Sequence, residues 1–167
     1  RLPSVSLIFF LCVPVSLWLG PPVQINAQVR PIYDQGSNGL GQLLKRLNNT
    51  KSVMHIGAHP DDEDSDLLAY LARAENARTV YLSLTRGDGG QNVIGPELFE
   101  SLGIIRTEEL LQARRLDGAE QLFTRAFDYG YSKRLDEARA KWDEKEILCD
   151  VVRAIRTFRP LVVIPRF

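Results

Sequence analysis

The chain has 167 residues, which is enough for one domain of ordinary size or slightly more. Its 21 Lys and Arg residues balance its 21 Asp and Glu residues, so the formal net charge is zero. This balance gives no electrostatic reason to expect a nucleic-acid partner. The charged fraction of 25% and the hydrophobic fraction of 44% exclude a disordered chain, and two cysteines exclude a disulfide framework.

Residues 1–27 have the pattern of a secretory signal peptide. Val5–Leu19 is a mostly apolar, uncharged run preceded by Arg1, and it is shorter than the roughly 20 residues that a membrane-spanning helix needs. Ala27 supplies a small residue for cleavage. We therefore predict export to the periplasm or the cell exterior, with no stable membrane span. The alternative is an uncleaved N-terminal segment that anchors the protein in the membrane.

The remainder reads as a lead-in segment followed by alternating strands and helices. Residues 28–50 form the lead-in and end in a short helix that carries Leu43, Leu44 and Leu47. Strands are predicted at 52–58, 79–84, 123–128 and 161–164, and helices at 65–75, at 107–121 and from Asp143 to just before Pro160. The continuous apolar run at 161–164 is typical of a strand covered on both faces.

This alternation predicts an α/β fold with a Rossmann-like, three-layer parallel sheet, incomplete within the chain and preceded by the signal peptide. In such sheets ligands bind beyond the carboxyl ends of the strands. The strongest chemical signal lies at such a place, because the first strand is followed by the acidic stretch His59–Asp64.

His59 and Asp62 have residue types and a spacing that suit a metal ion. Imidazole and carboxylate are both good zinc ligands, and a separation of three residues across a turn lets both converge on one ion. Asp61 lies between them and is available to take a proton from a metal-bound water. The alternative is an acidic turn that only caps a helix, for which Asp64 and Ser65 would already suffice.

A metal hydrolase site needs about three protein ligands and one open position for water. The only other histidine, His55, lies within the predicted strand, roughly 13 Å from His59 along an extended backbone. We therefore predict that His55 is a core or supporting residue and that the third ligand lies beyond Phe167, although an Asp or Glu could substitute. A set of His and Asp ligands accepts Zn²⁺, with Fe²⁺ and Mn²⁺ as alternatives.

The stretch Ala58–Glu63 resembles the signature of the PIG-L (LmbE-like) deacetylase family, metal-dependent enzymes that remove N-acetyl groups from sugars. The likeness continues in the glycine-rich loop Thr85–Gln91 and in the arginine-to-glutamate segment Leu102–Leu110. It runs from about Val53 to Phe167. The resemblance implies that residues 51–167 are the N-terminal portion of a domain of this family.

The resemblance also implies roles for particular residues. His59 and Asp62 would be zinc ligands and Asp61 the general base, while the third ligand, a histidine in a later motif, would lie outside this chain. We accordingly expect the 167 residues alone to bind metal weakly and to be inactive.

Three further residues are candidates for substrate binding. By the resemblance, Arg106 stands where family members bind substrate hydroxyls, and Gln91 stands where some members have an acidic substrate contact. Arg86, in the glycine-rich loop, is a candidate to touch an anionic or hydroxylated substrate. The plainer interpretations are that Arg106 pairs with Glu109 three residues on and that Arg86 is solvated.

The function predicted is a zinc-dependent hydrolase that removes N-acetyl groups from an amino-sugar-containing substrate, a free sugar or a glycoconjugate. One alternative is a non-catalytic carbohydrate-binding or interaction module that keeps the fold with an incomplete metal site. A nucleotide-binding domain is a weaker alternative, because the acids of the signature would repel phosphate and the glycines at 87, 89 and 90 form no phosphate-binding motif.

Overall fold

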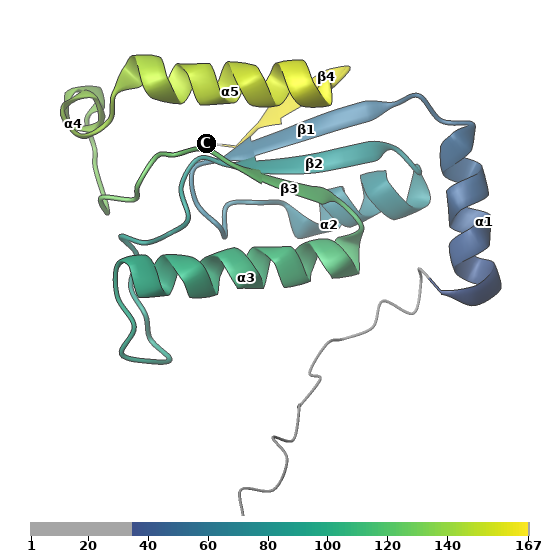
Figure 1. Ribbon diagram of the computed structural model, residues 1–167, viewed down its shortest axis with the longest axis horizontal. Coiled ribbons are helices and arrows are strands. Elements are labelled where there is room, and N and C mark those ends of the chain that lie inside the picture. Colours follow the sequence, from purple (N-terminus) through teal and green to yellow (C-terminus); the bar gives the residue numbers. More distant parts are fainter. Residues whose placement is uncertain (1–34, 167) are drawn as a thin grey trace, which may run out of the picture.

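Four parallel strands in the order β3-β2-β1-β4 form the centre of the structure, a computed structural model that describes residues 35–166. The strands are β1 (Ser52–Gly57), β2 (Arg78–Ser83), β3 (Glu120–Phe123) and β4 (Val162–Pro165). The helices are α1 (Gly36–Leu47), α2 (Ser65–Ala69) with the π-helical turn η2 (Tyr70–Ala74), α3 (Glu100–Asp117), α4 (Leu135–Lys141) and α5 (Glu144–Phe158). Helix α5 covers one face of the sheet and α2 and α3 cover the other, which confirms the three-layer α/β prediction (Figure 1).

Alternate side chains of β2 serve the two layers. Val80 and Leu82 are fully buried in a cluster with Phe158 of α5. Tyr81, between them in sequence, is fully buried in the cluster on the α2 and α3 side, where it contacts Leu68. Successive side chains of a strand point to opposite faces, so a strand covered on both sides reads as a continuous apolar run.

The third strand was predicted in the wrong place. It occupies Glu120–Phe123, whereas the sequence suggested 123–128. Helix α3 begins at Glu100, earlier than predicted, and ends at Asp117, where Gly118 takes a left-handed φ of 83°. This glycine stops the helix and turns the chain directly into the sheet, so residues 124–128 are left free to form a loop beyond it.

The prediction that the last strand is covered on both faces was also wrong for the part of the chain described. Val162 and Val163 are 51% and 41% exposed. Strand β4 pairs with β1 through Val53–Ile56 and lies at one end of the strand order.

The predicted signal peptide at 1–27 lies outside the described residues, as does the lead-in up to residue 34. The short helix predicted at the end of the lead-in is confirmed as α1. Within residues 35–166, none of the helices has the length and apolar character needed to cross a membrane.

Candidate active site

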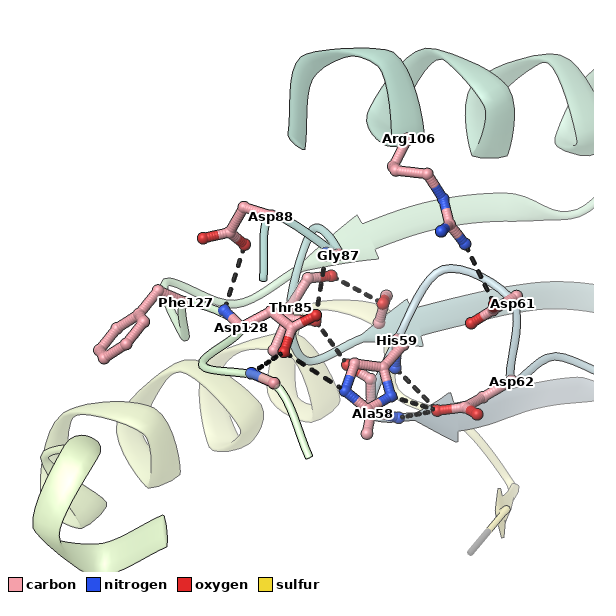
Figure 2. Close-up of polar contacts among 12 residues, drawn as sticks. Ala58, His59, Asp61, Asp62, Thr85, Gly87, Asp88, Arg106, Phe127 and Asp128 are labelled. Carbon is pink, nitrogen blue, oxygen red and sulfur yellow. Dashed lines mark hydrogen bonds and ion pairs between the residues drawn. The ribbon is translucent and has the colours of Figure 1, made fainter. Parts of the chain in front are cut away.

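The loops that follow β1, β2 and β3 begin at the same level of the sheet. Gly57 is aligned with Ser83, and Ser83 with Phe123. Because the strands are parallel, the segments starting at Ala58 and Thr124 emerge at one edge of the sheet. This brings the signature turn, Ala58–Glu63, and the loop after β3 together (Figure 2).

His59 and Asp62 face each other across the signature turn. The Nδ1 of His59 lies 3.2 Å from Oδ2 of Asp62. The same carboxylate oxygen accepts hydrogen bonds from the backbone N–H of Ala58 at 3.1 Å and of His59 at 2.8 Å. The two side chains remain 43% and 36% exposed, so the turn holds them facing each other while leaving them open to solvent.

The two facing atoms, an imidazole nitrogen and a carboxylate oxygen, are of the kinds that bind zinc. In this structure they lie 3.2 Å apart, at hydrogen-bonding distance, which is also close enough for both to reach one ion. Among the residues that the structure describes, no group of three or more His, Cys, Asp or Glu side chains is placed to hold an ion.

Asp61 and Arg106 are also brought together. The Asp61 side chain is 71% exposed, and its Oδ2 lies 3.3 Å from a guanidinium nitrogen of Arg106 on α3 (Figure 2). The Nε of Arg106 lies 3.2 Å from Glu109. The plain pairing with Glu109 therefore exists, and in addition Arg106 reaches over the signature turn.

The other two predicted substrate contacts lie differently. Arg86 donates a hydrogen bond to Oγ1 of Thr107 at 2.9 Å, and its guanidinium lies 4.2 Å from the ring centre of Phe123. It lines an open groove of about 590 Å³ together with Asp88. Gln91 is exposed in the loop after β2. Neither residue has a recorded contact with the His59 and Asp62 pair, and their roles stay predictions.

Asp128 is a site residue that the sequence analysis missed. It follows β3, its side chain is only 6% exposed, and its Oδ1 lies 3.8 Å from Nε2 of His59. Two hydrogen bonds hold this loop in place. The N–H of Gly130 donates to Oδ1 of Asp128 at 2.8 Å, and the N–H of Asp128 donates to Oδ1 of Asp88 at 3.1 Å. An acid in the loop after the third strand was the available signal, but the strand predicted at 123–128 included Asp128 and so concealed it.

The sequence profile of the PIG-L family, described as GlcNAc-PI de-N-acetylase, matches residues 54–166, well over half of the chain. The chain belongs to the PIG-L family. It is also 32% identical over 145 residues to the 1D-myo-inositol 2-acetamido-2-deoxy-alpha-D-glucopyranoside deacetylase of Kineococcus radiotolerans. That match covers 72% of this chain but 40% of the relative, so the chain spans less than half of that relative's length.

Solved structures place this PIG-L chain in a known fold. It superimposes on N,N'-diacetylchitobiose deacetylase from Pyrococcus horikoshii with a TM-score of 0.51 at 18% identity, over 78% of this chain and 49% of the other. It superimposes on GalB, the 4-carboxy-2-hydroxymuconate hydratase of Pseudomonas putida, with a TM-score of 0.52 at 20% identity, over 68% and 46%. Because one is a deacetylase and the other a hydratase, these likenesses show the fold alone.

The PIG-L signature is tied to the body of the domain through Glu63. Glu63 lies 3.1 Å from Arg114 of α3, which also lies 2.7 Å from Asp117, and the side chains of all three are at most 7% exposed. Burial raises the pKa of the Asp117 carboxyl above its usual range, although Arg114 works in the opposite direction. Arg114 thus pairs with two buried acids, one of which, Glu63, belongs to the signature turn.

Proposed function

We propose that this protein hydrolyses the N-acetyl amide of an amino-sugar-containing substrate with the help of a divalent metal ion, for which zinc is the leading candidate. The profile of its family is described as a de-N-acetylase, and the relative from Kineococcus radiotolerans is a deacetylase of an acetamido sugar linked to inositol. The observation that carries the proposal is the facing pair of His59 and Asp62 with the exposed carboxylate of Asp61 beside it.

His59 and Asp62 would hold the ion. When bound, zinc supplies Lewis-acid chemistry, which activates water and polarises a carbonyl group. Asp62 is oriented for this by the two backbone N–H groups that bind its Oδ2. With Nδ1 of His59 turned toward the ion, its Nε2 faces the carboxylate of Asp128, the kind of partner that usually orients a metal-binding imidazole.

Asp61 would act as the general base. Its carboxylate takes a proton from the attacking water while the water oxygen forms a bond to the acetamide carbon. The carbon–nitrogen bond then breaks, and Asp61 returns the proton to the leaving amine, so the products are acetate and a free amino sugar. Arg106 orients Asp61 through their 3.3 Å ion pair and offers further N–H donors to sugar hydroxyls.

The test compares Asp61→Ala with Asp66→Ala, an exposed acid on α2 outside the site, in protein made from the full coding sequence. Release of free amine from the acetamido-glucosyl inositol is followed, and bound metal is quantified. We expect Asp61→Ala to lower kcat by about 10²- to 10⁴-fold with unchanged metal content, and Asp66→Ala to behave as wild type.

Other outcomes separate the alternatives. A loss of metal in proportion to activity would make Asp61 a ligand and not the base. If the wild-type protein binds N-acetylated sugars but releases no amine, the non-catalytic module is the correct interpretation.

Export is a separate proposal, based on the apolar run Val5–Leu19 and the small residue Ala27. Cell fractionation of the native protein with N-terminal sequencing tests it. A mature chain that begins at Gln28 outside the cytoplasm is the expected result, and a cytoplasmic chain that retains residues 1–27 contradicts the proposal.

A further inference from the structure

We propose that Tyr81 is a positioning residue that fixes the backbone of His59, and through it the imidazole that binds the metal. The phenol belongs to β2 and is separated from His59 by 22 positions in sequence. The inference rests on the proposed function for its metal, but the structural contact that carries it is independent of any ligand.

The contact is a short hydrogen bond in a fully buried position. The hydroxyl of Tyr81 donates to the carbonyl oxygen of His59 at 2.6 Å. The tyrosine has no exposed surface and is packed against Leu68 and Leu110. The guanidinium of Arg114 lies 5.5 Å from its ring centre. Because the ring is fixed by this packing, its hydroxyl is a donor at a fixed point beneath the signature turn.

The carbonyl of His59 depends strongly on this one donor, whereas the carbonyl of Ala58 does not depend on any single donor. The other hydrogen bond recorded to it comes from the N–H of Asp62 at 3.4 Å, which is long. By contrast, the carbonyl of Ala58 accepts two good bonds from Thr85, one from its N–H at 2.9 Å and one from its hydroxyl at 3.0 Å. Removing the phenol hydroxyl therefore removes the short bond at the residue that carries the imidazole.

The glycine at position 57 is a second, independent sign that this contact is built in. A Cβ on Gly57 would clash with the hydroxyl of Tyr81 and would lie 2.9 Å from Cβ of Asp62. The phenol hydroxyl thus occupies the space where a side chain at 57 would stand, next to the second proposed ligand. The turn and the strand beneath it fit together only with a glycine here.

The orientation of the peptide after His59 helps to set the direction of its side chain. If that peptide is free to rotate, the imidazole must be ordered again each time a metal binds, and this ordering opposes binding. Loss of a group that orients a metal ligand typically weakens metal affinity by about 10- to 100-fold. A hydroxyl that acts through the backbone belongs at the lower end, so we expect about a tenfold effect.

The experiment compares Tyr81→Phe with Thr79→Val in protein made from the full coding sequence. Thr79 is a matched control, because it is buried in the same strand and its hydroxyl donates to the carbonyl of Ala77 at 3.1 Å, away from the site. Each variant loses one buried hydroxyl and one hydrogen bond, so both should lower Tm by similar amounts. Competition with a chromophoric chelator should show Kd for Zn²⁺ raised about tenfold in Tyr81→Phe and within twofold of wild type in Thr79→Val.

Amide hydrogen exchange of the metal-free proteins gives a second reading. Exchange at residues 58–62 should be faster in Tyr81→Phe than in wild type or Thr79→Val. Equal zinc affinity in the two variants, or unchanged exchange in the turn, would overturn the inference. If the wild-type protein binds no zinc, the proposed metal-dependent function fails, and exchange in the turn then decides alone whether Tyr81 fixes it.

Discussion

Replacing Arg114 with Met should destabilise the domain severely. Arg114 contacts two buried acids, Glu63 at 3.1 Å and Asp117 at 2.7 Å. The side chains are 4% exposed for Arg114 and 7% for each acid, so water screens the pairs poorly. Methionine fills a similar volume, which means that the main change is the loss of positive charge between two carboxylates.

The expected loss is about 3–5 kcal/mol, the usual cost of removing one partner from a buried ion pair. For a domain whose total stability is about 5–15 kcal/mol, this is about a fifth or more of the free energy of unfolding. The loss should also depend on pH. Burial already raises the pKa of Asp117, and the variant lacks Arg114, one of the groups that oppose this shift.

The direction in which stability changes with pH follows from proton binding. When the pKa of an acid is higher in the folded state than in the unfolded state, the folded state binds more protons, and stability falls as pH rises through the raised pKa. Arg114→Met should therefore lose most stability at about pH 7 and recover part of it at about pH 5. Adding Asp117→Asn should recover part of the loss at neutral pH and weaken the pH dependence.

Urea unfolding of Arg114→Met and of Arg115→Met, at both pH values, provides the measurement. Arg115 is the matched control, because it is the next residue of α3 and is exposed. If the two variants lose the same stability at about pH 7, the buried acids do not need the cation and the argument is wrong.

Three further predictions follow from single contacts. Asp143→Ala removes the side chain that accepts from the N–H of Lys145 and Glu146 at the start of α5, and urea unfolding should show a loss of about 1 kcal/mol. Gly89→Ala places a Cβ against the carbonyl of Asp128, and it should lower zinc affinity as well as stability. Unchanged zinc affinity would show that Asp128 does not contribute to the site. Hydrogen bonding to Arg125 lowers the pKa of Asp150 to about 2, so its stabilisation is present above the unfolded pKa of about 3.9 and is lost as pH falls toward 2. Asp150→Asn should make Tm less dependent on pH in that window. A slope of Tm against pH equal to that of wild type would contradict the pairing.

The elements that the sequence predicted well are those whose signals are local. Strand β2 is a run of β-formers bounded by polar residues, and the structure places it within one residue of the prediction. Helix α5 is preceded by Asp143, whose side chain caps it, and ends at Phe158 before Pro160. In both cases adjacent residues suffice, because a cap or an apolar run needs no information from distant parts of the chain.

Strand β3 could not be placed in this way. Its four residues include the polar Glu120 and Gln121, and none of the four is fully buried. Pairing with β2 from Val80 to Ser83, together with the turn at Gly118, makes this segment a strand. The apolar residues Ala126 and Phe127 made the following segment look more strand-like, but they lie beyond Phe123, which pairs with the last residue of β2.

The candidate site divides along the same line. His59, Asp61 and Asp62 could be recognised because one short turn contains them all. Arg114 and Tyr81 could not, since they reach the turn from 51 and 22 positions away and nothing in their own neighbourhood marks them. Asp128 comes to within 3.8 Å of His59 for the same reason, through the order of the strands.

The signature turn therefore contains two kinds of residue with different consequences for change. His59, Asp61 and Asp62 present chemical groups to solvent, whereas Glu63 faces inward toward Arg114. Gly57, at the end of β1 just before the turn, faces Tyr81. A chain that keeps the signature but loses Tyr81 or Arg114 would retain every group of the proposed chemistry and still hold it less firmly. Intact residues in the turn are thus necessary for the proposed activity, but the strand and helix beneath them determine whether those residues are held in the geometry that the reaction needs.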